Sequence, residues 1–216
     1  MGCSGTKEKI EFTRILAPVD YDTKNKIKVI FLIGGPGSGK GTQCKKMTEA
    51  YECIQISTGE LLRNVVSEGK NPKSEEIKKV QSEGGLVSSN LLLDVVAPKL
   101  FELRDQVILF DGFPRNKENM EAWKKKGLEE YFDVIATIYY ECSPETMTER
   151  ILGRNQGRSD DNQEGAKKRI EKFNKETVPI IDTLPNVKKI NAEGEKEAIT
   201  EETFKFLDEL QIQKKE

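Results

Sequence analysis

Apolar runs that favour β-strands alternate along this chain with segments whose apolar residues recur at helical spacing. The apolar runs occupy residues 28–33, 53–56, 106–110, 134–140 and 187–190. Strands separated by helices are typical of βαβ units, in which the strands lie parallel and the helices cover the sheet. The pattern therefore predicts an α/β fold with a five-stranded parallel sheet.

The helical patterns, taken with their start and stop signals, predict eight helices. They are expected at 40–50, 59–68, 74–83, 89–102, 116–126, 144–154, 163–182 and 196–211. Pro98 should end or bend its helix, because proline lacks the amide N–H and its ring crowds the preceding turn. Residues 57–105, between the second and third strands, are far more than one crossover needs. They predict a separate helical flap over the site.

With 216 residues, the chain can form one compact α/β domain with a substantial core. Residues 1–26 are polar and irregular, and we interpret them as an N-terminal extension ahead of a core that begins at Ile27. The chain contains neither the roughly 18 consecutive apolar residues that a membrane span needs nor an apolar signal-peptide core. We expect a cytoplasmic protein, and a monomer.

Charge and residue usage exclude several classes of function. The 35 basic and 37 acidic residues nearly cancel, so no nucleic-acid partner is expected. The chain has no histidine, which excludes a Ser-His-Asp triad, a Cys-His pair and an H-E-x-x-H metal site. The four cysteines form no C-x-x-C pair and indicate reduced thiols instead of a zinc site or a disulfide framework.

A glycine-rich segment with a lysine, from Gly34 to Thr42, follows the first predicted strand. Glycine permits positive φ and lets backbone N–H groups point into one concavity, and Lys40 stands where it can reach outer phosphates. A glycine-rich turn alone is common, but here a strand precedes it and a helix follows, as a P-loop requires. The residues expected to bind nucleotide phosphates are Gly35, Pro36, Gly37, Ser38, Gly39, Lys40, Gly41 and Thr42. Because Gly41 stands where Ser or Thr is usual, Thr42 is the nearest hydroxyl for a metal.

The third predicted strand ends in Asp111, as in P-loop enzymes that hold Mg²⁺ through its waters. Gly112 and Pro114 also allow the plainer interpretation of a strand-end turn. Arg115 follows closely, so a carboxylate and a guanidinium converge at the carboxyl end of a parallel strand, where open α/β sheets bind ligands. This position favours a functional interpretation.

Arginine is scarce in this chain, with eight arginines against 27 lysines, and four of the eight are Arg150, Arg154, Arg158 and Arg169. Lysine already serves for surface solubility, so clustered arginine indicates bidentate binding of phosphate, although a helix with a solvated basic face is the alternative. Ser57 to Arg63 carries a helix-start signature that places Arg63 one turn into the helix. Arg63 alone could be an ordinary surface residue.

Four ordered motifs resemble those of the short-type nucleoside monophosphate kinases of the adenylate kinase family. They are Gly34 to Cys44, Ser57 to Arg63, Asp111 to Arg115 and Gly157 to Asn162, within a match over residues 27–212. The resemblance implies a three-layer P-loop fold, a core over 27–212, a helical flap for the nucleoside monophosphate (NMP) at 57–86 and a short lid at 154–162. Only three residues separate Arg154 from Arg158, fewer than is usual even for a short lid.

The resemblance also implies roles for individual residues. Lys40 would contact the β- and γ-phosphates of ATP, Arg150 would stack on the ATP adenine, and Asp111 would hold Mg²⁺ through water. Arg154, Arg158 and Arg169 would converge on the transferring phosphoryl group with Lys40 and Arg115. The residues expected at the acceptor monophosphate are Thr58, Arg63, Gly112, Arg115, Asn119, Arg158 and Arg169.

Two acceptors remain open. Adenylate kinases carry Gln at the position of Asn119, whereas UMP-CMP kinases carry Asn there, Asn at the position of Asn116 and Trp at that of Trp123. The shorter amide of Asn119 suits a pyrimidine. Thr58 argues the other way, because adenylate kinases usually have Thr there and UMP-CMP kinases usually have Ala. We therefore expect UMP or CMP, and also dCMP, as the acceptor, with AMP as the alternative.

The chemistry agrees with the lack of histidine. An NMP has its second pKa near ~6, so at neutral pH it is already a nucleophilic oxyanion and needs no general base. The enzyme has to align two polyanions and offset charge, which Arg, Lys and Mg²⁺ can do. A GTPase switch is disfavoured because no N-K-x-D motif appears, and a non-catalytic scaffold because Lys40, Asp111 and the arginines are intact.

The first six residues fit the M-G-x-x-x-[ST] pattern for N-myristoylation at Gly2, and Cys3 beside it could take a second acyl chain. The pattern is short, and an ordinary flexible start is the alternative. One myristoyl chain binds membranes only marginally, so stable attachment would need Cys3 palmitoylation as well. The sequence thus raises the hypothesis of a membrane-attached form.

Overall fold

A five-stranded parallel sheet forms the centre of the molecule in the computed structural model, which describes residues 13–19, 21, 24–82, 85–153 and 162–216. Its strands lie in the order β2-β3-β1-β4-β5. They are β1 (Ile27–Gly34), β2 (Cys53–Ser57), β3 (Val107–Asp111), β4 (Phe132–Glu141) and β5 (Val187–Asn191). The predicted sheet and all five strands are confirmed.

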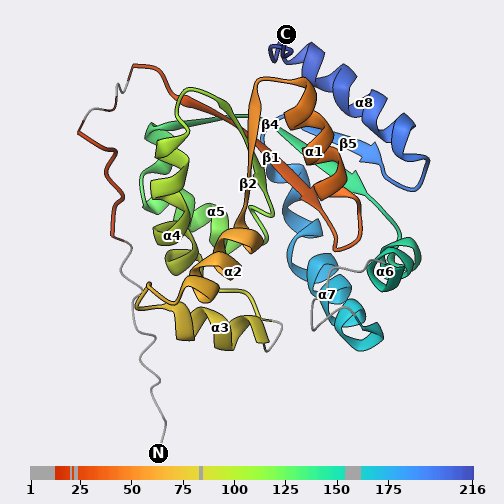
Figure 1. Ribbon diagram of the computed structural model, residues 1–216, viewed down its shortest axis with the longest axis horizontal. Coiled ribbons are helices and arrows are strands. Elements are labelled where there is room, and N and C mark those ends of the chain that lie inside the picture. Colours follow the sequence, from red (N-terminus) through yellow and green to blue (C-terminus); the bar gives the residue numbers. More distant parts are fainter. Residues whose placement is uncertain (1–12, 20, 22–23, 83–84, 154–161) are drawn as a thin grey trace, which may run out of the picture.

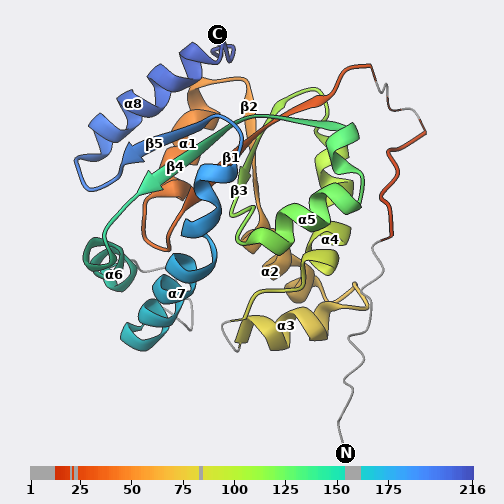
Figure 2. The same ribbon diagram turned by 180° about the vertical axis from the view of Figure 1, so that it is seen from behind.

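Helices cover both faces of the sheet, as Figures 1 and 2 show from opposite sides. They are α1 (Lys40–Ala50), α2 (Thr58–Glu68), α3 (Ser74–Ser82), α4 (Ser89–Glu102), α5 (Lys117–Lys125), α6 (Pro144–Gly153), α7 (Gln163–Glu176) and α8 (Lys196–Glu209), with 3₁₀ turns at Leu128–Glu130 and Val178–Thr183. Among the described residues, every helix is too short or too polar to span a bilayer.

The central strand β1 contributes to two separate hydrophobic cores, because successive side chains of a strand point to opposite faces. Val29 and Phe31 lie in the cluster that packs against α4 and α5. Ile30 and Leu32 lie in the cluster that includes residues of α1 and α8. All four are fully buried. A nearly continuous apolar run is thus what a strand covered on both faces requires.

One predicted helix is wrong. The segment 163–182 is not a single helix, because α7 ends at Glu176 and a 3₁₀ turn with a proline at its start follows. Pro179 has no N–H to donate, and its ring would crowd the carbonyl one turn back. Pro98, by contrast, does not end its helix, since α4 continues to Glu102.

The carboxyl ends of the strands all point toward one edge of the sheet, where α2, α3, α6 and α7 lie (Figure 1). The chain leaves the neighbouring strands β1 and β3 for opposite faces, since α1 packs in one core and α5 in the other. Such a switch point is where open α/β sheets bind ligands. The P-loop follows β1, and Asp111 is the last residue of β3.

Residues 13–19 and 21, here called the N-terminal strap, precede the sheet without regular secondary structure and pack on its outer helices. Ile15 donates its N–H to the Lys126 carbonyl at 3.0 Å, and the side chains of Ile15 and Tyr21 pack against the core. The Lys126 ammonium is fully buried, 2.6 Å from the Asp94 carboxylate and 3.3 Å from the Thr13 carbonyl. The strap therefore covers the junction of α4 and α5.

Candidate functional site

The P-loop between β1 and α1 is shaped by glycine at two points where another residue would be strained. Gly37 and Gly39 have φ of 84° and 89°, in the left-handed region. A Cβ at Gly37 would stand 2.5 Å from the carbonyl oxygen of Met147 on α6. The hydroxyl of Ser38 is buried and makes no hydrogen bond to the described residues. The loop thus offers a buried polar group and its backbone to an anion.

Lys40 opens α1 and lies across the P-loop. Its ammonium donates to the carbonyls of Gly34 at 2.5 Å and Gly35 at 3.1 Å. Loss of hydration lowers the pKa of Lys40 below its usual value, and the Asp111 carboxylate partly offsets this effect. A poorly hydrated ammonium gains strongly from contact with phosphate, because charges interact more strongly where water is excluded.

Asp111 ends β3 beside the P-loop, and its carboxylate accepts a hydrogen bond from the amide of Gln55 at 3.1 Å. Among the described residues, no three acidic, cysteine or histidine side chains form a metal cage. Mg²⁺ usually keeps several waters and binds one or two carboxylates together with substrate phosphates. A single carboxylate beside a phosphate-binding loop fits such a shared, hydrated metal.

Arg115 is fixed by groups around the end of β3. Its guanidinium donates to the Gly112 carbonyl at 2.9 Å and to the Thr58 hydroxyl at 3.2 Å, and its own carbonyl accepts from Thr177 at 2.6 Å. Gly112 has φ of 77°, and a Cβ there would stand 2.9 Å from the Thr58 hydroxyl. Burial lowers the pKa of Arg115, with Asp111 acting in the opposite direction. The guanidinium is thus held in one place before any ligand binds.

Further cations gather around the same carboxylate. Arg63 and Arg115 each place a guanidinium nitrogen within 4 Å of the point where a Cβ of Gly59 would stand. Arg169, on α7, is close enough to lower the pKa of both Lys40 and Arg115. Side chains from α1, α2, α7 and the turn after β3 therefore converge on one region with Asp111, an arrangement that favours a polyanionic ligand.

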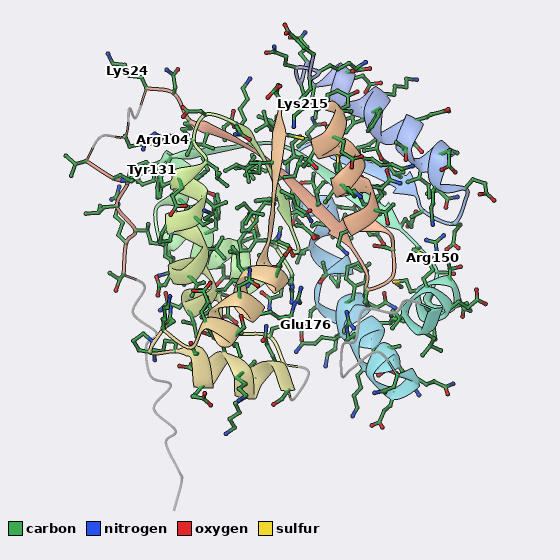
Figure 3. All side chains as sticks on the ribbon, viewed as in Figure 1. Lys24, Arg104, Tyr131, Arg150, Glu176 and Lys215 are labelled. Carbon is green, nitrogen blue, oxygen red and sulfur yellow. The ribbon has the colours of Figure 1, made fainter. Side chains whose placement is uncertain are left out.

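The remaining predicted arginines do not join this cluster in the described residues. Arg150 lies on α6, away from α2 and α3 (Figure 3), and donates to the Ala192 carbonyl at 2.8 Å. Arg154 and Arg158 lie outside the described residues, as do most of the predicted lid 154–162 and the acylation candidates Gly2 and Cys3. Gly41 and Thr42 are exposed on the first turn of α1.

A small hollow, here called the pocket, opens beside the cation cluster, between α2, α4 and the start of α5. Leucine and valine side chains form most of its wall, with polar groups at one side. Its lining residues are Thr58, Leu62, Leu86, Val87, Leu92, Arg115 and Asn119. Apolar walls with a few placed polar groups are typical of a site for a nucleobase or other small ligand.

Asn119 is buried, not a surface amide. Its Oδ1 accepts from the backbone N–H of Arg115 at 2.9 Å, and its Nδ2 donates to the hydroxyl of Ser89 at 2.7 Å. Asn116 is the N-cap of α5 and accepts from the backbone N–H of Asn119 at 2.9 Å. Trp123 packs among Phe31, Phe113 and other aromatic rings of the core. Two of the three residues that suggested a pyrimidine acceptor therefore have structural roles here.

Sequence reasoning missed several residues that hold the site together, among them Gln55, Ser89, Met147 and Thr177. Each acts on a partner far away in the chain, such as Gln55 on Asp111 or Thr177 on Arg115. No local motif carries such contacts, because they depend on how the elements pack. Only Gln55, a polar residue inside a short apolar run, gave a visible signal.

Comparison with known proteins places this site in a family context. The family model described as adenylate kinase matches residues 32–189. Adenylate kinase isoenzyme 1 of Rattus norvegicus is 37% identical over 196 residues, which cover 88% of this chain and 98% of the rat protein. UMP-CMP kinase of Sus scrofa is 37% identical over 194 residues, covering 84% and 97%. UMP-CMP kinase 3 of Arabidopsis thaliana is 39% identical over 181 residues, covering 82% and 87%. Overall identity does not separate the two kinds of relative.

Proposed function

The chain belongs to the adenylate kinase family and is a nucleoside monophosphate kinase, and we propose that it transfers the γ-phosphoryl group of ATP to UMP or CMP, and to dCMP. The products would be ADP and the nucleoside diphosphate. The observation that carries this proposal is the convergence of Lys40, Arg115 and Arg169 near Asp111, beside a pocket whose lining includes the buried Asn119.

The donor half of the site is the P-loop. Backbone N–H groups of Gly35, Gly37, Ser38 and Gly39 would bind the phosphates. Lys40 would exchange its loop carbonyls for phosphate oxygens, and Arg150 would face the adenine. Transfer from ATP in this family generally needs a divalent metal, and we infer Mg²⁺, held through water by Asp111. When bound, the metal neutralises charge that develops on the phosphates.

The acceptor half is the pocket with its cations. Arg63 and Arg115 would hold the acceptor phosphate, whose oxyanion needs no general base at neutral pH. Arg154, Arg158 and Arg169 would offset charge on the phosphoryl group in transit. The flap 57–86 and the lid 154–162 would close over both nucleotides and exclude water, which suppresses hydrolysis of ATP.

Asn119 supports a pyrimidine acceptor, because its short buried amide lies in the pocket wall. Thr58 favours AMP instead, because adenylate kinases usually have Thr at this position and UMP-CMP kinases usually have Ala. Thr58 is buried, and its hydroxyl contacts the Asp111 and Gly112 carbonyls and Arg115, so it is a fixed part of the pocket. The alternative function is therefore that of an adenylate kinase, in which ATP and AMP give two ADP.

Steady-state rates with UMP, CMP, dCMP and AMP as acceptors test the proposal. We expect kcat/KM to be highest for UMP or CMP. The control is Lys40→Met, which should lower kcat by about 10²–10³-fold because a phosphate contact made during transfer is lost. A wide margin in favour of AMP would contradict the proposed acceptor and leave the kinase assignment intact.

Acylation at Gly2 and Cys3 is a separate proposal that rests on the sequence pattern alone. We propose a membrane-attached form beside a cytoplasmic one, with the enzyme a monomer in both. Intact mass of the protein from its own cells should show a myristoyl group at Gly2, and light scattering in solution should give the monomer mass. An unmodified amino terminus with a free thiol at Cys3 would remove the attachment proposal.

A further inference from the structure

The hydrogen bonds around Asn119 have only one possible direction. The backbone N–H of Arg115 can only donate, so the side-chain atom that faces it at 2.9 Å must be the oxygen of Asn119. The amide nitrogen of Asn119 therefore faces Ser89 and donates to its hydroxyl at 2.7 Å. The chain of hydrogen bonds fixes which way the amide points.

Ser89 is the element of this arrangement that comes from another part of the fold. It stands at the start of α4, whereas Arg115 and Asn119 belong to the turn after β3 and to α5. Ser89 and Asn119 are 2% and 3% exposed, so neither side chain can exchange its partner for solvent at little cost. The pocket lining includes Asn119 but not Ser89. Ser89 thus lies behind the amide that faces the pocket.

We propose that Ser89 is a positioning residue for acceptor recognition: it holds the Asn119 amide in the orientation that reads the acceptor base. The inference deepens the proposed function and rests on it, but it holds for a pyrimidine or for adenine. The Asn119 nitrogen and oxygen each make one of these hydrogen bonds. The nitrogen therefore keeps one hydrogen, and the oxygen one lone pair, for a base. The amide presents a donor and an acceptor in fixed places.

Removing the hydroxyl would release one end of the amide. In Ser89→Ala, the Asn119 nitrogen loses its hydrogen-bond acceptor. The amide can then turn away from the base or donate to a different group. Part of the binding energy of the acceptor would then go to reorienting the amide, as expected when a recognition group is no longer preorganised. The binding of ATP should not change, since no contact connects Ser89 with the P-loop among the described residues.

The test compares Ser89→Ala with Ser88→Ala in the full chain. Ser88 is the exposed N-cap of the same helix and accepts from the Leu91 N–H, so its loss weakens α4 without touching Asn119. We expect Ser89→Ala to raise the KM and the Kd of the preferred acceptor about 3- to 10-fold, with kcat and the KM for ATP unchanged. Ser88→Ala should lower the melting temperature and leave the acceptor KM near the wild-type value.

Ribose 5-phosphate, which carries the phosphate and sugar without a base, separates recognition from a general structural effect. Its inhibition constant against the acceptor should be the same in wild type and Ser89→Ala. Equal acceptor KM values for Ser89→Ala and wild type, or an equal loss for the baseless ligand, would overturn the inference. Equilibrium Kd values for UMP, CMP and AMP are measured independently of turnover. A chain that binds them with a Ser89-dependent Kd but transfers no phosphate would refute the proposed function alone.

Discussion

At the scale of single residues, the space around a side chain and the charges near it determine which positions tolerate substitution. Gly37 combines a left-handed backbone with a neighbouring backbone carbonyl, that of Met147 on α6. Gly153, at the end of α6, has no atom of the described residues within 4 Å of the place of a Cβ. The two glycines therefore form a natural pair for comparison.

We expect Gly37→Ala to lower the free energy of unfolding by about 2 kcal/mol, because it adds left-handed strain to a clash with backbone. Gly153→Ala should change it by less than about 1 kcal/mol, and in the stabilising direction, because alanine favours a helix. Urea unfolding measures both values. Equal stabilities of the two variants would contradict the close approach of the P-loop to α6.

Lys40 should make stability depend on pH in a defined direction. Its pKa is lowered in the folded protein and stands at 10.5 when the protein is unfolded. Between the folded pKa and 10.5, the unfolded state therefore binds more protons than the folded state. The contribution of Lys40 to stability rises as the pH increases through this range. Because methionine does not titrate, Lys40→Met should be more stable than wild type at pH 7. This advantage should shrink as the pH approaches the pKa of lysine in the unfolded chain. Unfolding free energies of both proteins between neutral and alkaline pH test this; a constant difference would contradict it.

At the scale of elements, the buried Lys126 ammonium couples three segments: the strap, α4 and α5. The two members of its ion pair differ in exposure, since the Lys126 side chain is fully buried and that of Asp94 is 52% exposed. An unpaired charge costs much more in the interior than at the surface. Loss of Asp94 and loss of Lys126 should therefore lower the free energy of unfolding by very different amounts.

Asp94→Ala should lower the free energy of unfolding by about 2–3 kcal/mol, because it leaves the buried ammonium with the Thr13 carbonyl. Lys126→Met should cost less than about 1 kcal/mol, since an apolar chain of similar length replaces the buried cation and Asp94 can be hydrated. Denaturant unfolding of the two variants and of the double variant checks this. A double variant less stable than Asp94→Ala would contradict it.

The helices also show where prediction from the sequence succeeds and fails. Strands and most helices follow from periodicity and from caps, because these signals lie within the element itself. The break before Val178 was missed because apolar spacing continues across it, and only Pro179 marks the change. In the candidate site, local motifs predicted Lys40, Asp111 and Arg115, and the structure brings these three residues together. Ser89 and Thr177 were not predicted, because the partners that give them a role are brought together only by packing.

At the scale of the whole molecule, the site concentrates like charge. Burial is the main cause that lowers the pKa values of Lys40 and Arg115; repulsion from Arg169 adds to it in both, and the Asp111 carboxylate opposes it. The folded protein therefore carries electrostatic repulsion that a polyanion relieves. Phosphate groups, more than the base, should determine how strongly a nucleotide stabilises the fold.

We expect ATP at 100 times its Kd to stabilise the protein by about 2.7 kcal/mol, or about 5–10 °C in melting temperature. Adenosine at the same concentration should shift it far less, and added salt should reduce the effect of ATP. Differential scanning calorimetry with ATP, ADP, AMP and adenosine measures the series. An equal shift with adenosine would show that the cation cluster does not bind the phosphates.

The position of β1 in the sheet has a consequence for how the protein is made. This strand is the first of the five to leave the ribosome. Its edge that pairs with β3 stays open until residue 111 has been synthesised, and its edge that pairs with β4 until residue 141. At about 5–20 residues per second, the roughly one hundred intervening residues take on the order of 5–20 s. During that time this apolar strand keeps at least one edge exposed, and the cell's chaperones have this interval in which to protect it.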